Sequence, residues 1–542
     1  MSFSSTSFLW FLAVFLVLYG LCPARFKLYL LLAGGVLFVG LGSVSAALWA
    51  LLFLAVNYLL GICVQRSSKP KLAMACSVAV NAVALVTFKL LNTGALGLSY
   101  YLFAYMAYLA EIYRGTMRAE SDPIRFAAYG FFFPKFTMGP ITRYSELSEQ
   151  LERPRITAAN IQKGLEDFTL GFVLKLLVAD KLGVLFGDGY YALKTVGYEA
   201  ISTKLAWLGA VVTSLHIYIE WIAYMYMALG IARLLGYELP QNFNYPYIAR
   251  TVGDYYRRWH MTLTRWFKDF VYIPLGGSRK GLLRTVVNVL FVWLLTSLWH
   301  GNGLAPKYLL WGLLSGVIVA LTPLWRNIVL RGAGKRPGAG SRVLGWLPLL
   351  LLIPLSWFFL REPDSGFNFI LWGMSIGLMI VLERLWKTFV AERLRVGEVL
   401  GTAGLAGRLW KGFVSLLAHI WVVIPMVLSW VVFTIKDNEQ LAVYFSRLFP
   451  AAGASAGADP ADFAKNWAMV GPYVIVALLF CVPLLSWLKS LLKRFAFGEK
   501  VLRFMGSKLA AWIVSAILAG LFWYAVYVLI ENGSDPMGYA AF

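Results

Sequence analysis

The sequence predicts an all-α integral membrane protein that passes through the bilayer many times. Hydrophobic residues make up 60% of its 542 residues and charged residues 14%, against about 45–50% and about 25% in soluble domains. Apolar runs long enough to cross about 30 Å of hydrocarbon recur along the chain. They are continuous rather than alternating, which favours helices over a barrel. This composition excludes a soluble enzyme, a disordered chain and a fibrous protein.

The apolar runs give the positions of the expected spanning helices. These lie near residues 5–21, 27–43, 45–65, 72–91, 95–112, 162–187, 204–232, 285–300, 308–325, 344–360, 367–386, 412–435, 467–487 and 509–530. We treat residues 1–542 as one polytopic domain, with a catalytic core at about 95–325 and C-terminal helices at about 344–530.

The placement of the basic residues predicts the topology. Lys and Arg number 49 and Asp and Glu 27, a net charge of +22, which in a soluble protein would suggest a nucleic-acid partner. When the N-terminus is set outside and the spans alternate, most Lys and Arg fall in cytoplasmic loops, as the positive-inside rule requires. The densest group lies between Arg233 and Arg284. We therefore expect both termini outside and no nucleic-acid partner.

Residues 126–140 are apolar but are not expected to span. The stretch FAAYGFFFPKFTMGP contains two prolines, two glycines and Lys135, a composition that disfavours a continuous spanning helix. We expect a re-entrant or interfacial segment on the cytoplasmic side.

Residues 252–275 predict an amphipathic helix at the membrane surface. Aromatic and aliphatic side chains recur at helical spacing, with His260 at the edge of the apolar face. The apolar positions are Tyr256, Trp259, Leu263, Trp266, Phe267 and Phe270. An interfacial anchor without chemistry explains the same pattern and stays open at this point. The turn after it, at Gly276 and Gly277, carries cations that could meet a phosphate-bearing donor.

The other histidines lie in or at the end of apolar runs, where an ionisable group suggests function. His216 precedes Glu220 by one helical turn, and we expect a structural role for it, as for His419. His300 differs because Gly301 and Gly303 follow it and bend the backbone at a helix end. A neutral imidazole there can act as a general base.

The chain offers no obvious protein nucleophile or metal site beside His300. The four cysteines have no paired spacing, and His, Asp and Glu do not cluster as ligands. One buried base then fits direct transfer, in which an acceptor hydroxyl loses its proton and attacks an activated acyl group.

Several motifs in order resemble bacterial membrane-bound O-acyltransferases of the alginate O-acetylation type. They include Phe133-Pro134-Lys135 with Gly139-Pro140, Arg257-Arg258-Trp259-His260, Tyr272-Ile-Pro274-Leu-Gly276-Gly277, Ser297-Leu-Trp299-His300-Gly301 and, near the end, Asp535-Pro-Met. The match runs nearly end to end. One departure is Glu220-Trp-Ile-Ala-Tyr224, where the family commonly has Asp-Phe-Ser-Gly-Tyr.

The resemblance implies a ring of helices around a central funnel in the bacterial inner membrane. His300 would be the essential catalytic histidine, and His260 the second catalytic position, near the cytoplasmic entrance. The family uses a cytosolic acyl thioester, such as acetyl-CoA, as donor substrate, with no bound cofactor. A periplasmic acetyltransferase partner and a polysaccharide-synthesis complex are the expected partners, with membrane lipid.

We expect substrate contacts from aromatic and basic residues around the two histidines. These are Trp259, Trp299, Arg257, Arg258, Arg279 and Lys280. The cations could attract an anionic donor, and plain positive-inside anchoring explains them equally well.

The function that these residues favour is O-acetylation of an exported polysaccharide. Two alternatives remain. One is D-alanyl transfer to a cell-wall polymer from a carrier protein. The other, from a different class, is a non-catalytic glycolipid channel or flippase, for which His300 would be dispensable.

Overall fold

The computed structural model describes residues 1–91, 97–185, 193, 197–300, 379, 383, 405–435, 437–450, 459–495 and 497–534, and all regular structure in these ranges is helical. The expected spans 308–325 and 344–360 lie outside them, as does 367–386 apart from two residues. The main helices are α1 (Thr6–Leu21), α2 (Lys27–Gly42), α3 (Val44–Arg66), α4 (Pro70–Leu90), α5 (Leu98–Tyr113), α6 (Pro123–Gly130), α7 (Tyr144–Glu152), α8 (Ala158–Val173), α9 (Asp180–Gly183), α11 (Thr203–Leu234), α12 (Val252–Arg258), α13 (Met261–Phe267), α14 (Leu282–His300), α20 (Leu405–Thr434), α21 (Asn438–Leu448), α22 (Asp462–Phe480), α23 (Leu484–Leu492), α24 (Gly498–Met505) and α25 (Lys508–Asn532).

Several helices confirm the predicted multipass architecture. Seven within the described ranges are long and apolar enough to cross a bilayer: Ala24–Gly42, Val44–Arg66, Pro70–Phe88, Thr203–Leu234, Gly407–Thr434, Asp462–Phe480 and Lys508–Asn532. α1 and Leu283–Thr296 are apolar but shorter. The expected span at 162–187 is divided into α8, a π-helical turn (Leu174–Ala179) and α9. The expected span at 467–487 ends at Phe480, because Pro483 begins the separate helix α23.

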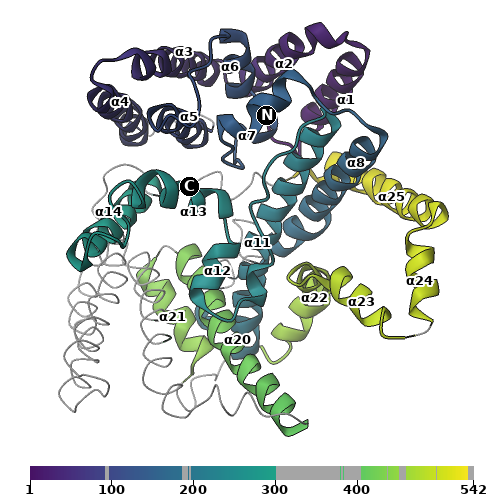
Figure 1. The fold of residues 1–542 in the computed structure, drawn as a ribbon. Coiled ribbons are helices and arrows are strands. Elements are labelled where there is room, and N and C mark those ends of the chain that lie inside the picture. Colours follow the sequence, from purple (N-terminus) through teal and green to yellow (C-terminus); the bar gives the residue numbers. More distant parts are fainter. Residues whose placement is uncertain are drawn as a thin grey trace.

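Helix α11 is the internal post of the molecule (Figure 1). It has 32 residues, and 78% of the residues in its most apolar 18-residue stretch are buried inside the protein. α11 packs against α8 within one hydrophobic cluster, which also includes residues of α1 and α5, and against α20 and α22 within a second. Because a lipid-facing helix would leave its apolar side chains exposed, this burial places α11 between two halves of the fold.

Glycines let α8 and α11 approach closely. A Cβ atom built on Gly171 would lie 2.4 Å from the carbonyl oxygen of Ala223, and one on Gly230 would lie 2.4 Å from the backbone nitrogen of Phe168. Small residues at such contacts bring helix backbones together within membranes. The α8–α11 pair is therefore fixed by backbone contact.

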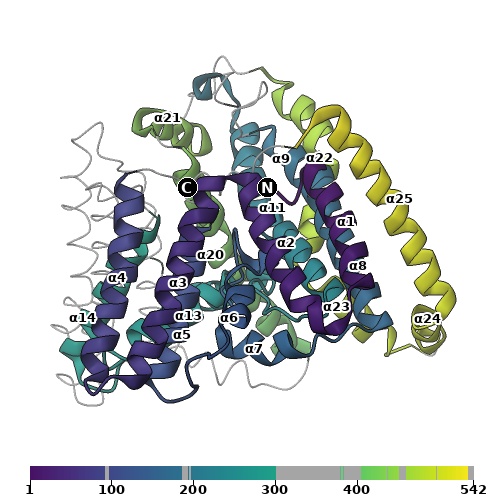
Figure 2. The same cartoon turned by 90° about the horizontal axis from the view of Figure 1, so that it is seen from above.

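The two ends of the described chain meet around a buried lysine. The Lys175 ammonium lies 2.7 Å from Asp180 Oδ1 and 3.0 Å from Glu220 Oε1. The Ser534 hydroxyl donates a hydrogen bond to Asp180 Oδ2 at 3.1 Å and lies 3.2 Å from the hydroxyl of Ser4, from which it can accept. The start of α1 and the end of α25 accordingly lie on the same side of the molecule (Figure 2).

We expect Gly171→Val to destabilise the protein by about 1–3 kcal/mol or more, because the new side chain meets the backbone of α11. Thermal unfolding in detergent would measure this. Gly520→Val is the matched control, since no atom lies within 4 Å of a Cβ built on Gly520 in α25. Equal losses in the two variants would contradict the close α8–α11 contact.

Candidate active site

The predicted continuous helix over 252–275 is wrong, because the chain breaks between Arg258 and Met261. α12 ends at Arg258, Trp259 is extended and His260 adopts the left-handed conformation with φ 46°. Left-handed backbone is costly for a residue other than glycine, and such strain clusters at functional sites.

The break is held by a neighbouring segment that supplies the missing hydrogen bonds. The backbone oxygen of Asn242 accepts from the Met261 amide at 2.8 Å. Its side-chain oxygen accepts from both the amide and the hydroxyl of Thr262, at 3.0 and 2.9 Å. On the other side, the Asn244 amide donates to the carbonyl of Arg258. These bonds replace the helical ones and fix where the side chain of His260 points.

The side chain of His260 is buried in an aromatic pocket. It is 5% exposed, with its ring centroid 5.3 Å from that of Trp221, 6.1 Å from that of Trp299 and 6.4 Å from that of Tyr100. Within the described part of the chain, neither ring nitrogen has a hydrogen-bond partner. Burial lowers the pKa of His260 to about 4, so the ring is neutral at physiological pH. A neutral imidazole offers one donor and one acceptor, and both are uncommitted here.

Helix α14 leads to this pocket. Its buried Asn288 donates to the carbonyls of Leu275 and Gly277, which anchors the preceding turn. Trp299 near its end lies against His260 and Phe103. His300 is the last residue of α14, and its side chain lies outside the described part of the structure. The fold thus brings His260 and Trp299 together and ends α14 one residue later.

The expected re-entrant segment lies beneath the same pocket. The second part of α6, from Phe126 to Gly130, and the short turn Phe133–Lys135 are buried. The Tyr129 hydroxyl donates to the Thr142 carbonyl at 2.8 Å, which connects the start of the segment to its end. The Ile141 amide donates to the Thr262 hydroxyl at 3.1 Å. The segment therefore helps to position Thr262, which lies two residues after His260.

Lys135 is buried in this segment beside a small cavity of about 10 Å³, enough for one water molecule. Its ammonium lies 3.3 Å from the ring centroid of Tyr129, a cation–π contact. The cavity is also lined by Tyr100, whose ring stacks near that of His260. This small cavity thus lies one aromatic ring away from His260.

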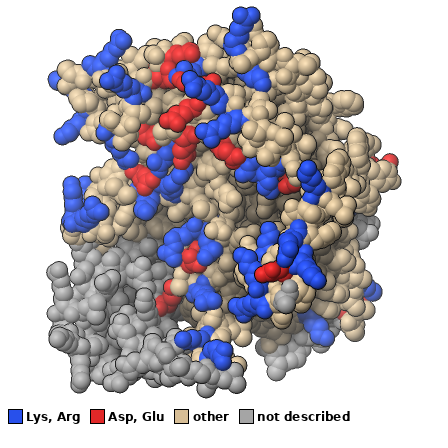
Figure 3. Space-filling model, turned by 45° about the vertical axis from the view of Figure 1, so that its right-hand side comes forward, with Lys and Arg blue, Asp and Glu red and all other residues tan. Residues whose placement is uncertain are grey.

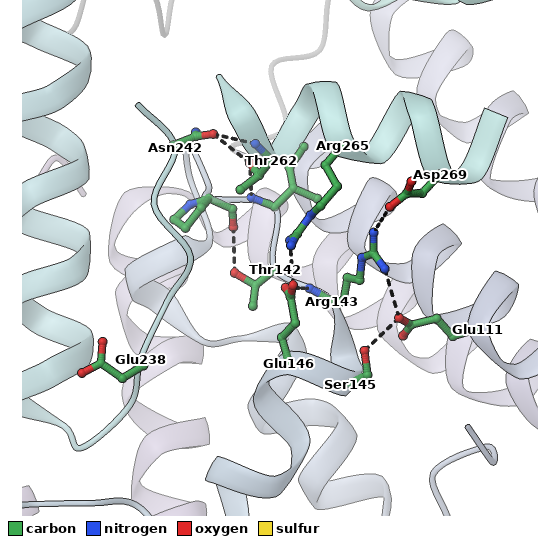
Figure 4. A network of polar contacts seen from close by, with 12 residues as sticks. Glu111, Thr142, Arg143, Ser145, Glu146, Glu238, Asn242, Thr262, Arg265 and Asp269 are labelled. Atoms are coloured by element: carbon green, nitrogen blue, oxygen red, sulfur yellow. Dashed lines mark hydrogen bonds and ion pairs between the residues drawn. The ribbon is translucent and has the colours of Figure 1, made fainter. Parts of the chain in front are cut away.

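An ionic network clamps the second half of the broken segment to α5 and α7 (Figure 4). Arg143 pairs with Asp269 and reaches Glu111, and Ser145 donates to Glu111 at 2.8 Å. Arg265 pairs with Glu146 at 2.7 Å. Sequence reasoning did not assign this network a role. The sequence signal that could have indicated it is the presence of carboxylates such as Glu111 in or beside apolar runs, because such groups require partners.

Two arginines also enclose the aromatic ring of Phe270. The guanidinium of Arg114 lies 5.0 Å and that of Arg143 4.9 Å from the ring centroid. Trp266, one turn earlier, donates to the backbone oxygen of Phe103 at 2.8 Å. The apolar side chains of residues 261–272 therefore pack largely against protein and do not form an exposed apolar face.

The remaining predicted substrate residues lie apart from the His260 ring. Trp259 packs against Phe243 and Trp430, both with centroids 5.0 Å away. Arg258 donates to Asp254 at 2.9 Å and to the carbonyl of Asn244, so it braces the break. Arg257 is exposed and lies 3.4 Å from Asp254.

Arg279 and Lys280 are exposed on the turn before α14. Gly276 and Gly277 both have positive φ there, and Arg284 donates to the carbonyl of Leu275 at 2.8 Å. Among the described residues, Arg279 and Lys280 form no ion pair. Their charges are therefore available to an anion.

The other two histidines bond backbone carbonyls. His216 Nδ1 lies 2.9 Å from the oxygen of Ala179, in the π-helical turn, and His419 Nδ1 lies 3.2 Å from that of Ala249. Glu220, expected beside His216, bonds Lys175 instead. Structural roles account for both rings.

The helical fold, with several apolar helices and a buried histidine beside the end of α14, can now be compared with known protein families. Residues 115–347 match the model of the membrane-bound O-acyltransferase family. The chain is 32% identical over 400 residues to the probable alginate O-acetylase AlgI of Pseudomonas fluorescens, covering 69% of this chain and 77% of the relative. The chain belongs to the membrane-bound O-acyltransferase family and is an O-acyltransferase of the alginate O-acetylase type.

More distant relatives act on cell-wall polymers by name. The peptidoglycan O-acetyltransferase of Helicobacter pylori is 31% identical over 242 residues, 44% of each chain. The teichoic acid D-alanyltransferase of Bacillus subtilis is 26% identical over 234 residues, 41% of this chain and 58% of the relative.

The buried His260 predicts a specific pH dependence of stability. The unfolded chain takes up a proton near the ordinary pKa of 6.5, whereas the folded state stays neutral down to about 4. The folded state therefore loses stability as the pH falls from about 6.5 to about 4, by about 3 kcal/mol in total.

We expect His260→Gln to remove this component, so that the variant loses less free energy of unfolding than wild type between pH 7 and pH 4.5. Denaturant unfolding in detergent at the two pH values gives the difference. An identical pH slope in the two proteins would contradict a neutral, buried His260.

Proposed function

We propose that the protein transfers an acetyl group from a cytosolic acyl thioester for O-acetylation of an exported polysaccharide at the bacterial inner membrane. The observation that carries this proposal is the buried His260 with two uncommitted ring nitrogens, in contact with Trp299. A polar group left unsatisfied in an apolar site costs free energy. It is retained where a ligand supplies the missing partners.

The proposed chemistry assigns the base to His300, the residue after Trp299. His300 takes the proton of the acceptor hydroxyl, whose oxygen attacks the thioester carbonyl carbon. The carbon–sulfur bond breaks and the thiolate leaves. His260, neutral and oriented by the backbone break, donates a hydrogen bond to the acyl oxygen on which negative charge develops.

The donor side of the site is proposed at the basic turn before α14. Arg279 and Lys280 lie on the same chain segment as the pocket, with Arg257 on α12. Figure 3 shows Lys and Arg gathered in clusters on one face of the molecule. Cations at the entrance raise the local concentration of an anionic donor such as acetyl-CoA. A periplasmic acetyltransferase and a polysaccharide-synthesis complex would receive the acyl group.

A second candidate is D-alanyl transfer to a cell-wall polymer from a carrier protein. The similarity to the teichoic acid D-alanyltransferase of Bacillus subtilis favours it. The relatives named as alginate O-acetylases match a longer part of the chain and at higher identity, and we therefore rank acetylation first.

We expect His300→Ala to lower the ester content of the exported polysaccharide by at least about 100-fold, the usual contribution of a general base. Ester content per polymer mass is measured in cells that produce equal amounts of the protein. His419→Ala is the control, since its ring bonds a backbone carbonyl away from the pocket. Wild-type ester content in the His300→Ala strain would favour a non-catalytic channel or flippase.

The donor is tested with purified protein in proteoliposomes. We expect labelled acetyl-CoA to be consumed in the presence of acceptor, and consumption to weaken in Arg279→Gln and Lys280→Gln through a higher KM at unchanged kcat. Activity only with an acyl carrier protein would instead support the D-alanyl branch.

A further inference from the structure

The segment that joins α22 to α25 has an apolar surface that the described protein leaves uncovered. No residue of α23 is buried. Its Leu485 and Trp487 are 55% and 53% exposed, and Phe497 and Phe504 nearby are 60% and 50% exposed. Apolar surface left in water costs about 25 cal/mol per Å². Because α22 and α25 are candidate spans, the segment lies where a bilayer can cover it.

Both short helices are amphipathic. On α23, Ser486, Lys489, Ser490 and Lys493 recur at helical spacing and share one face, while leucines and Trp487 fill the other. On α24, Glu499, Lys500 and Arg503 share a face opposite Val501, Leu502 and Met505. Helices with one basic and one apolar face lie in the interfacial plane of a membrane.

The polar faces carry a strong positive excess. Lys489, Lys493, Arg494, Lys500, Arg503 and Lys508 are all exposed. Glu499 is the single acidic residue between Leu484 and Lys508, and it lies 3.5 Å from Arg503. Among the described residues, the other cations of this segment form no ion pair. Their counter-charge must come from outside the described chain.

We propose that the α23–α24 segment is a binding site for anionic phospholipid headgroups. Its apolar side chains enter the acyl-chain boundary, and its cations hold the phosphate and glycerol headgroups beside α22 and α25. Each Lys or Arg near an anionic bilayer surface contributes about 1 kcal/mol, so several cations together select anionic over zwitterionic lipid. The site is separate from the His260 pocket and does not depend on the proposed acyl transfer.

The test uses the full-length protein in detergent, titrated with phosphatidylglycerol or phosphatidylcholine and read by native mass spectrometry. We expect the wild type to bind phosphatidylglycerol more tightly. Replacing Lys489, Lys493 and Arg494 with Gln should weaken that binding by about tenfold or more. The matched control replaces Arg66, Lys69 and Lys71, one Arg and two Lys on the exposed α3–α4 connection, and should leave it unchanged.

Equal affinity for the two lipids, or an equal loss in the control, would overturn the proposal. A variant that keeps its lipid affinity but loses an acidic protein partner would overturn it as well. Should the triple variant fail to fold, the wild type still gives an answer. Its binding of phosphatidylglycerol should weaken between 0.1 and 0.5 M NaCl, because salt screens exposed charges; salt-independent binding would also contradict the site.

Discussion

The candidate site depends on one local constraint, the pairing of Asn242 with the chain just after His260. Asn242 accepts hydrogen bonds from the amides of Met261 and Thr262, which take the place of helical ones, and a third from the Thr262 hydroxyl. Without them, the sequence from 252 to 275 has the periodicity of one continuous helix, on which His260 would point toward the membrane boundary. The break turns the imidazole inward, onto Trp221 and Trp299. Site geometry therefore depends on hydrogen bonds to both the backbone and the side chain of Asn242.

Buried polar groups in this protein differ in whether a described residue compensates them. Lys175 is fully buried but lies between two carboxylates, and Arg143 lies between Asp269 and Glu111. Low-dielectric surroundings make such compensation necessary. His260 is as buried and has no such partner among the described residues. The proposed function rests on this contrast between His260 and the two compensated cations.

Hydropathy and charge placement predicted the helical, multipass fold because every spanning segment must satisfy its own backbone. The absence of a continuous helix over 126–140 was equally predictable, since its prolines and Lys135 disfavour a spanning helix. The break at His260 was not, because Asn242 lies 18 residues earlier and periodicity records only local spacing. The role of Glu220 was missed for the same reason: its partner Lys175 belongs to another helix.

The neutrality of His260 bears on how a nearby base would work. A positively charged imidazole in an apolar site lowers the proton affinity of a neighbouring histidine. Because burial keeps His260 uncharged well below neutral pH, its ring places no positive charge in the aromatic pocket near pH 7. In the proposed function, the base assigned to His300 would therefore meet no opposing charge from His260. In the same proposal, the task of His260 is to donate a hydrogen bond.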